Sequence, residues 1–190
     1  MAEREIWLVR HGETEWSRTG RHTGRTDIPL TAEGERQART LAPPLAAHAF
    51  GQVLTSPLQR ARRTCELAGF GARARALPDL MEWDYGQYEQ RLTAEVRREV
   101  PGWTVWTHPV PGGETLDDVA RRARRVLAEV EAGEGDALLF AHGHLLRVLT
   151  MCWIGLAPAA GGLFALGAAS VSVLGYETER RVMTRWNLAP

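Results

Sequence analysis

Two short apolar runs, near opposite ends of the chain, each stop at a histidine followed by a glycine. Residues 6–9 lead into His11, and residues 137–141 lead into His142. Continuous apolar runs of this length are typical of buried strands, and the second is typical of a central strand in a parallel sheet. Open α/β sheets place their ligands at the carboxyl edge of such strands. The pattern therefore predicts a sheet that carries two imidazoles at its ligand-binding edge.

The segments between and after these runs alternate between strand-like and helix-like patterns. We expect further strands at about residues 52–55, 74–77, 170–176 and 181–187, the last two forming a hairpin. Helices are expected at about residues 31–48, 57–68, 92–100 and 115–132, and from residue 145 onward. This alternation predicts an α/β fold, a three-layer αβα sandwich around a mostly parallel sheet, in a single domain of residues 1–190.

Several helix ends carry recognisable signals. Thr31 is expected to cap the helix that follows it, and Ser56 the next one along the chain. Thr115 with Asp118 resembles a capping box. Residues 10–30 are polar and show little periodicity, which indicates a long functional loop rather than a helix.

The charged residues exclude some kinds of chemistry. All 23 basic residues are arginines, so the chain has neither a phosphate-loop lysine nor a Schiff-base lysine. The formal net charge is zero, which favours neither nucleic acid nor a membrane surface as a partner. Cys65 and Cys152 are too few for a disulfide scaffold and are expected to be small buried residues. Any bound oxyanion must therefore be held by arginine, histidine or backbone amides.

The apolar segments set an expectation about location. The run at residues 6–9 is too short for a signal peptide, so a cytoplasmic enzyme is expected. Residues 148–176 carry no charge and are long enough to span a bilayer, but proline and several glycines interrupt them. We expect the end of a helix, a loop and a core strand there, with a membrane span as the less favoured alternative.

Three strand ends together offer a set of cationic and nucleophilic groups. They carry Arg10 and His11, Ser56 leading to Arg60, and His142. If these strands lie side by side, two imidazoles and two guanidinium groups converge on one pocket. Guanidinium groups bind phosphate oxygens bidentately and keep their charge, so such a pocket favours a dianion.

Simpler readings of the same residues remain open at this point. His11 alone could be a surface histidine at a strand end. The arginines after Ser56 could form a solvated basic face, which fits Arg62 better than Arg60. In the acidic and aromatic loop at residues 81–89, Glu82 and Asp84 are candidate proton carriers.

Five motifs in order resemble the histidine phosphatase superfamily, the phosphoglycerate mutase-like proteins, over essentially the whole chain. The motifs are LVRHGET at 8–14, TGRTDIPLT at 23–31, TSPLQRA at 55–61, EWDYG at 82–86 and FAHGH at 140–144. Each motif alone is modest evidence, but five in this order are specific. The resemblance implies a phosphoglycerate mutase-like fold.

The resemblance also implies a role for each matching residue. His11 would be the nucleophile that becomes phosphorylated, and Glu82 would donate a proton to the leaving oxygen. Arg10, Arg60 and His142 would bind the phosphoryl group. The positions that would line the substrate pocket are Ser17, Thr23, Gly24, Tyr85 and Gly143.

These residue types suit the implied chemistry. A neutral imidazole can attack phosphorus in line, and like-charge repulsion from clustered arginines should help to keep His11 unprotonated. A backbone carbonyl could hold its other ring nitrogen as N–H and so fix the tautomer. Arginine cations would supply the charge neutralisation that magnesium supplies in kinases, so neither a metal nor another cofactor is expected.

Details of the motifs favour one branch of the family, which contains bacterial acid phosphatases and fungal sugar-bisphosphatases. Cofactor-dependent mutases carry a longer insertion with a basic cluster after the proton-donor loop. Here residues 92–111 are short, and Arg97 and Arg98 are their only basic pair. Mutases also usually have asparagine at the position of Ser17. A further departure is Gln90, where relatives commonly have glycine, so the loop conformation there is open.

The sequence therefore predicts a metal-independent phosphatase that acts on small phosphorylated metabolites such as sugar phosphates, and no nucleic-acid or membrane partner. A phosphoglycerate mutase is the alternative, and a non-catalytic module that binds phosphorylated ligands is an alternative of another class. A third possibility is a metal site at His142 and His144 with a carboxylate. Residues 79–114 are expected to form a small flap, in which Trp103 and Trp106 either cover the leaving group or belong to the core. Many relatives are dimers, so a homodimer is possible.

Overall fold

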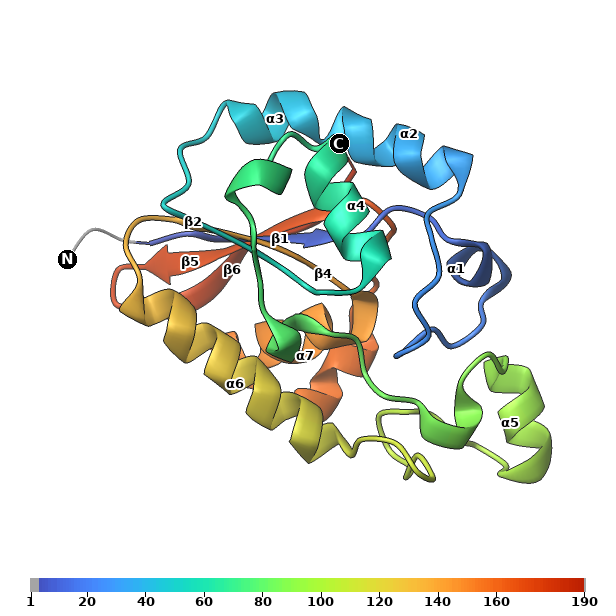
Figure 1. The fold of residues 1–190 in the computed structure, drawn as a ribbon. Helices are drawn as coiled ribbons and strands as arrows, with labels where there is room; N and C mark the ends of the chain where they lie inside the picture. The colour runs from blue at the N-terminus through green and yellow to red at the C-terminus, as the bar shows by residue number, and fades with distance from the viewer. Residues whose placement is uncertain (1–3, 190) are drawn as a thin grey trace.

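The computed structural model describes residues 4–189 and places a six-stranded sheet between two layers of helices (Figure 1). The strands are β1 (Ile6–Arg10), β2 (Gln52–Thr55), β3 (Arg75–Ala76), β4 (Ala137–Ala141), β5 (Val171–Glu177) and β6 (Arg180–Leu188). Their order across the sheet is β3-β2-β4-β1-β5-β6. The predicted αβα sandwich is therefore confirmed.

The sheet is parallel where the ligand edge was expected. β4 lies at its centre and pairs in parallel with β1 on one side and with β2 on the other, and β3 extends the parallel part beyond β2. β5 pairs with β1 in the antiparallel sense, and β6 then pairs with β5 as the predicted hairpin. The carboxyl ends of β1, β2 and β4 consequently lie side by side.

The helices cover the two faces of the sheet. Figure 1 shows α2 (Ala32–Thr40), α3 (Ala42–Ala46) and α4 (Gln59–Leu67) on one face, and α6 (Leu116–Ala132) and α7 (Gly143–Ile154) on the other. Thr31 caps α2 by accepting a hydrogen bond from the backbone of Gly34, and the Thr115–Asp118 capping box begins α6. Both caps were predicted from the sequence.

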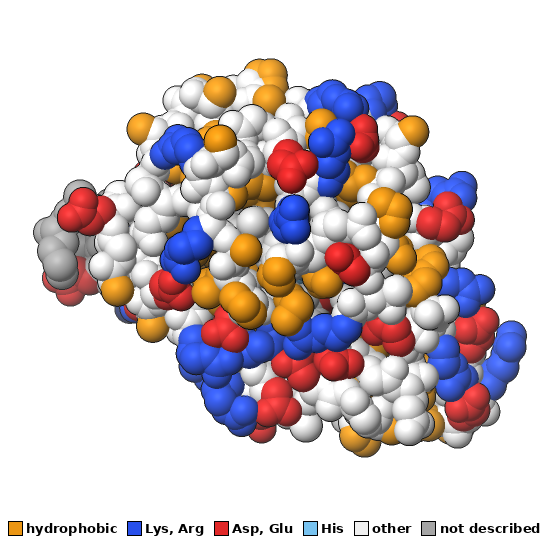
Figure 2. Space-filling model, viewed as in Figure 1, with side chains coloured by type: hydrophobic (Ala, Val, Ile, Leu, Met, Phe, Trp, Pro, Cys, Tyr) orange, Lys and Arg blue, Asp and Glu red, His pale blue; other side chains and the backbone are white. Residues whose placement is uncertain are grey.

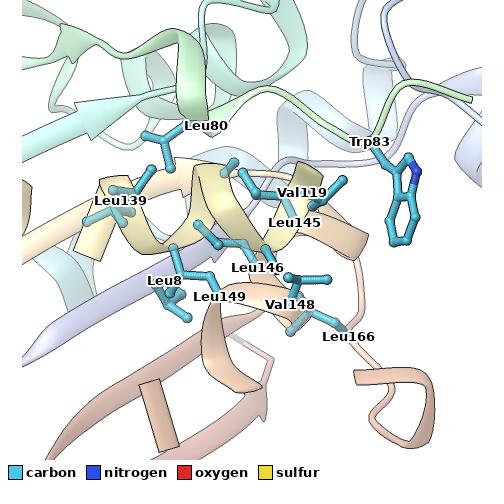
Figure 3. Packing of buried hydrophobic residues seen from close by; sticks show 14 of the residues in the cluster. Leu8, Leu80, Trp83, Val119, Leu139, Leu145, Leu146, Val148, Leu149 and Leu166 are labelled. Carbon is cyan, nitrogen blue, oxygen red and sulfur yellow. The ribbon is translucent and has the colours of Figure 1, made fainter. Parts of the chain in front are cut away.

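The core follows the alternation of side chains along each strand. In β1, Ile6 and Leu8 face the cluster beneath α6 and α7, whereas Trp7 and Val9 face the cluster beneath α2 to α4. Both clusters are continuous with β4, all of whose residues are buried. Figure 3 shows the α6 and α7 side of this core, with Leu139 from the sheet among its labelled leucines. This double burial explains why the two apolar runs are continuous rather than alternating.

Three local expectations were wrong. Residues 10–30 contain a short helix, α1 (Glu15–Thr19), which starts at a capping box between Thr14 and Ser17. Helix α4 begins at Gln59 with Leu58 at its N-cap, so Ser56 does not cap it. Helix α7 begins two residues earlier than predicted, directly after His142.

The uncharged stretch at residues 148–176 has the predicted structure. It contains the second half of α7, the 3₁₀ helix η4 (Pro158–Leu163) and most of β5. Across residues 4–189, none of the helices combines the length and apolarity that crossing a bilayer requires.

Residues 79–114 lie between β3 and the start of α6. They contain part of η2 (Pro78–Leu80), then η3 (Gly86–Tyr88) and α5 (Thr93–Glu99). Figure 1 shows α5 beyond the end of the sheet at which α1 lies. That residues 79–114 form a small flap stays a prediction.

Arginine and acidic side chains are interspersed on the surface. Figure 2 shows blue and red groups next to one another over α6. Two of the ion pairs are Arg121 with Asp118 at 2.8 Å and Arg125 with Asp79 at 2.7 Å. Exposed pairs of this kind contribute little to stability, about 0–1 kcal/mol each, but they neutralise the arginines that take part in them.

Candidate active site

A pocket of about 440 Å³ lies at the carboxyl edge of the parallel strands. Seven of the ten residues predicted to form the site line it: Arg10, His11, Ser17, Thr23, Glu82, Tyr85 and Gly143. Arg60, His142 and Gly24 lie directly behind this wall and are buried. The centroids of the two imidazole rings, His11 and His142, are 5.1 Å apart. The strand ends therefore bring the predicted groups together.

His11 has the geometry of a nitrogen nucleophile. Its ring Nδ1 lies 2.7 Å from the carbonyl oxygen of Gly12, and because a carbonyl can only accept, Nδ1 carries the proton. The other nitrogen, Nε2, then holds a free lone pair. Burial, followed by the charges of Arg60 and Arg10, lowers the pKa of His11 well below its ordinary value. The predicted repulsion by arginines is present, but burial is the larger cause of the neutral ring.

Arg10 presents an unused hydrogen-bond donor beside this nucleophile. One terminal nitrogen donates to the carbonyl of Leu166, but Nε is buried and has no partner among residues 4–189. A Cβ atom at Gly143 would lie 3.4 Å from that Nε, so the glycine keeps the approach to it open. A buried N–H without a partner is costly, and an anionic ligand in the pocket would satisfy it.

Arg60 joins the loop before the pocket to His142. It is buried in the first turn of α4 and donates from Nε to His142 Nδ1 at 3.2 Å. Its terminal nitrogens donate to the carbonyls of Thr26, Thr23 and Gly24 at 3.0, 3.1 and 2.9 Å. Arg62, by contrast, is exposed, as expected for a residue on a solvated basic face.

His142 uses both of its ring nitrogens inside the protein. Because Nδ1 accepts from Arg60, the proton lies on Nε2, which donates to Ser56 Oγ at 2.8 Å. Burial and the charge of Arg60 lower the pKa of His142 well below its ordinary value. Ser56 Oγ also accepts from the backbone N–H of Leu58 at 3.3 Å, ahead of the first turn of α4. Direct binding of a phosphoryl group by Arg60 and His142 stays a prediction.

Glu82 is held at the amino end of α7. One carboxylate oxygen accepts from the backbone N–H of Trp83 and Leu145, both at 2.9 Å, and the other accepts from the backbone of His144 at 3.0 Å. The side chain lines the pocket and is 5% exposed. The carboxylate is thereby fixed on the wall of the pocket that His11 also lines. Asp84, the other candidate, accepts from the backbone of Gly86 instead and is not part of the pocket wall.

An ion pair that the sequence analysis missed fixes the segment that carries Glu82. Arg122 on α6 binds both oxygens of Glu114 at 2.7 and 2.8 Å. The same guanidinium donates to the carbonyls of Asp79 and Met81. Burial raises the pKa of Glu114, but Arg122 outweighs it, so the net shift is downward. Arg122 follows Val119 by three positions and precedes Ala123 by one, and all three are buried in α6. This helical spacing was the sign in the sequence that Arg122 faces inward.

Tyr85 and two further histidines complete the middle of the pocket. The hydroxyl of Tyr85 lies 2.7 Å from His144 Nδ1, and burial raises the pKa of Tyr85 well above its ordinary value. His22 stacks against the ring of Tyr85 with centroids 5.0 Å apart, and its Nδ1 is buried with no partner in the described chain. His22 was not predicted as a site residue, and His144 was named only as a possible metal ligand.

The remaining predicted residues shape the wall. Ser17 Oγ accepts from the backbone of Thr14 at 2.9 Å, which places it at the start of α1. Gly24 is packed so closely that a Cβ atom would lie 2.4 Å from the carbonyl oxygen of Trp83. Gln90 has a φ of 67°, a left-handed conformation that favours glycine, which explains the glycine common in relatives.

The outer part of the pocket is aromatic and basic. Trp103 is 1% exposed and belongs to the core, as one of the two predictions had it; it also lines the pocket, and a role in covering the leaving group stays a prediction. Trp106 is half-buried and stacks on His144 with centroids 5.1 Å apart. Three arginines that the analysis did not assign line the same region: Arg21, Arg97 and Arg147.

One group in the described chain has the spacing of a metal site, and it lies elsewhere. Glu5, His48 and Asp136 each precede a parallel strand, so they lie at the opposite edge of the sheet from the pocket. Two of these side chains already bind each other, with His48 Nε2 at 2.7 Å from Asp136, and the Glu5 carboxylate accepts from Trp7 Nε1 at 2.9 Å. In the pocket, the imidazole nitrogens of His142 and Nδ1 of His144 are likewise occupied by side chains.

Comparison with known proteins identifies the family. The model of the histidine phosphatase superfamily (branch 1) matches residues 6–189. An acid phosphatase of Mycobacterium tuberculosis is 39% identical over 181 residues, 90% of this chain and 86% of the relative. Sedoheptulose 1,7-bisphosphatase of Saccharomyces cerevisiae is 36% identical over 78% of this chain and 67% of its own length. A probable phosphoglycerate mutase of Klebsiella pneumoniae is 33% identical over 96% and 89%.

A solved structure shows the same fold. A protein from an open reading frame of Mycobacterium tuberculosis superimposes with a TM-score of 0.92 at 36% identity, covering 98% of both chains. The shared fold, the matching motifs and the pocket at the carboxyl edge of the sheet agree with one another. This chain belongs to the histidine phosphatase superfamily.

Proposed function

We propose that the protein hydrolyses phosphomonoesters of small metabolites through a phosphohistidine at His11, without a metal ion. The single observation that carries this proposal is the arrangement around His11. Its Nδ1 is engaged by Gly12, its pKa is lowered, and the unpartnered Nε of Arg10 lies on the same pocket wall. A neutral nucleophile beside an unused cationic donor suits attack on a phosphoryl dianion.

The reaction would proceed in two steps. Nε2 of His11 forms a bond to phosphorus while the bond to the leaving oxygen breaks, and Glu82 gives that oxygen a proton. Water then forms a bond to phosphorus as the N–P bond breaks, with Glu82 taking the proton back from water. Arg10 would bind the phosphoryl oxygens directly. Arg60 would add positive charge behind it, and the neutral ring of His142 would hold Arg60 in place.

The wall residues would contact the rest of the substrate. Ser17, Thr23, Tyr85 and Gly143 line the pocket next to His11. The family relatives named as acid phosphatase and sugar bisphosphatase support a small phosphorylated metabolite as the substrate class. A relative named as a probable phosphoglycerate mutase keeps mutase activity as the second candidate.

A phosphate-release assay over a panel of sugar phosphates and phosphoglycerates tests the proposal. The protein should release phosphate from several of them and from p-nitrophenyl phosphate, and chelation by EDTA should leave the rates unchanged. Incubation with 3-phosphoglycerate and 2,3-bisphosphoglycerate separates the candidates. A phosphatase gives free phosphate, whereas a mutase gives the isomeric phosphoglycerate.

The His11→Ala variant is the matched control in every assay. Phosphate release that persists in this variant would remove the phosphohistidine route. Binding of phosphorylated ligands by the wild-type protein with no turnover would instead favour a non-catalytic binding module.

A further inference from the structure

The loop of residues 23–26 is held from two sides by charged side chains. On one side, Arg60 donates to three of its backbone carbonyls. On the other side, one carboxylate oxygen of Glu89 accepts from the backbone N–H of Gly24 at 2.7 Å and from that of Thr26 at 3.2 Å. The loop therefore separates a cation from an anion and contacts both through its backbone. The proposed reaction steps give this anion no role.

One peptide group of the loop joins the two charges directly. Its N–H, which belongs to Gly24, donates to Glu89, and its carbonyl, which belongs to Thr23, accepts from Arg60 at 3.1 Å. In a trans peptide these two groups point in opposite directions, so the carboxylate and the guanidinium lie on opposite sides. Hydrogen bonds in such a chain polarise one another, and bonds to ionised groups are the stronger kind.

The surroundings of Glu89 fix its carboxylate against the loop. Glu89 is half-buried and follows η3, where its own N–H donates to the carbonyl of Gly86 at 3.2 Å. A Cβ atom at Gly24 would lie 2.7 Å from the second carboxylate oxygen, so the glycine allows this close approach. Nearby, the backbone of His22 bonds to that of Gln90 at 2.9 Å. Without Glu89 the loop would still be attached at His22, but its part next to Arg60 would be freer to move.

The loop matters to the site through two groups. Thr23 lines the pocket. Arg60 makes four hydrogen bonds to residues 4–189, three to this loop and the fourth to His142. Burial lowers the pKa of Arg60, and the negative charge of Glu89 is one of those that oppose the shift. A displaced loop would therefore take away most of the bonds that orient the Arg60 guanidinium.

We propose that Glu89 is a positioning residue for the phosphoryl site and acts through the backbone of residues 23–26 on Arg60 and Thr23. The inference rests on the proposed function and adds a residue to it. Glu89 is not part of the pocket wall, so it acts without touching the substrate. Its loss should weaken the binding of the phosphoryl group, whereas proton transfer to the leaving oxygen belongs to Glu82.

Two substitutions at Glu89 test this role. Glu89→Ala removes the acceptor of both loop amides, so kcat/KM for p-nitrophenyl phosphate should fall roughly ten- to hundredfold. The inhibition constant of inorganic phosphate should rise by a comparable factor, because phosphate binds at the same groups. Glu89→Gln keeps an oxygen that can accept from the same amides and should retain more than half of the effect on a logarithmic scale.

A matched control separates positioning from general loss of stability. The Asp118 carboxylate likewise accepts from a backbone N–H, that of Thr115 at 3.0 Å, at the start of α6 and outside the pocket wall. Asp118→Ala should lower the melting temperature but leave kcat/KM and the inhibition constant of phosphate unchanged. If Glu89→Ala does not fold, Glu89→Asp replaces it, because the shorter side chain keeps the charge but cannot reach both amides.

A double-mutant cycle tests the route through Arg60. Arg60→Lys keeps a positive charge but cannot hold three carbonyls at once. If Glu89 acts through Arg60, adding Glu89→Ala to Arg60→Lys should lower kcat/KM much less than Glu89→Ala does in wild type. Fully additive losses would overturn this route.

The two proposals fail in distinguishable ways. Hydrolysis by wild type, with unchanged kcat/KM and phosphate inhibition in the folded Glu89 variants, would overturn the proposal about Glu89 alone. Absence of hydrolysis with every substrate would overturn the proposed function. In that case calorimetric titration with inorganic phosphate decides the role of Glu89. Tighter binding by wild type than by Glu89→Ala would support it, and equal binding, or none by either protein, would overturn it.

Discussion

The inner and outer ends of the pocket differ in how firmly their polar groups are held. At the inner end, Glu82 accepts three backbone hydrogen bonds, and Arg60 donates to three carbonyls and to His142. At the outer end, Arg97 and Arg147 are each held through Nε alone. The difference indicates a division of labour. In the proposed function, the inner end would be preorganised for the reaction, and the outer end would keep donors free to contact the substrate.

The elements that carry the two ends explain this difference. The inner groups lie at the ends of β1 and β4 and at the amino ends of α4 and α7, which pack on both faces of the sheet. Most of the outer wall comes from residues 103–106, from α5 and from the segment around η4, which lie outside the sheet, whereas Arg147 lies on α7 like some of the inner groups. The residues proposed to carry out the reaction are thus held by elements that pack on the sheet, whereas most of the outer wall comes from segments outside it.

Removal of the nucleophile should give the largest effect and is specific to the inner end. We expect His11→Ala to lower kcat for p-nitrophenyl phosphate by roughly a thousandfold or more, because no other group supplies Nε2 at that position. Steady-state release of p-nitrophenol measures it. His48→Gln, at the opposite edge of the sheet, is the matched control and should retain turnover. Comparable losses in both variants would mean that His11 has no special role.

The ion pair between Arg122 and Glu114 lies outside the pocket and supports the segment that carries Glu82, so its loss should destabilise the protein. Arg122→Met removes two charge-assisted hydrogen bonds from the half-buried Glu114, which keeps Arg25 at 3.3 Å and the backbone N–H of Asp84, so the free energy of unfolding should fall by about 1–3 kcal/mol. Urea unfolding measures the change. The double variant Arg122→Met, Glu114→Gln removes the remaining carboxylate charge and should recover part of the loss. No recovery would show that packing by the Arg122 stem, rather than charge, is responsible.

Replacement of the acid should separate substrates by their leaving groups. Glu82→Gln should lower kcat/KM roughly hundredfold for sugar phosphates, whose leaving oxygens need a proton. For p-nitrophenyl phosphate, whose leaving group is stable as an anion, the loss should be much smaller. Equal losses for the two substrates would mean that Glu82 is not the proton donor.

The buried histidines should make stability depend on pH in a defined direction. Burial lowers the pKa values of His11, His22, His142 and His144, so the folded protein resists their protonation. The unfolded chain takes up these protons as the pH falls below about 6.5, so the free energy of unfolding should decrease from there downward. Each histidine contributes up to about 1.4 kcal/mol per pH unit. Urea unfolding between pH 7 and 5 measures the slope, which should be shallower in His144→Gln; an unchanged slope would contradict this account.

The sequence predicted the inner end far better than the outer end, for a physical reason. The apolar runs before His11 and His142 are the direct consequence of burial on both faces of the sheet, so their ends could be located. Hydrogen bonds that bridge distant segments left no such local signal. Ser56 was predicted to cap a helix because the neighbouring residues gave no sign of its partner His142, which is 86 positions away.

The outer residues were hidden for related reasons. Arg147 lies in an apolar helix, and Arg97 stands in a basic pair with Arg98, so the local pattern did not show which arginine faces the pocket. Helix α1 has five residues, too few for a periodic pattern. The family motifs located the chemistry, whereas only the three-dimensional arrangement located the arginines that line the outer wall.

The most direct test of the account is detection of the phosphorylated protein. The protein is mixed with p-nitrophenyl phosphate, quenched in alkali, in which phosphohistidine survives, and digested for mass spectrometry. We predict one added phosphoryl group on the peptide that contains His11, and none in His11→Ala. A phosphoryl group on another residue, or steady phosphate release with no phosphorylated protein and undiminished turnover in His11→Ala, would contradict the account.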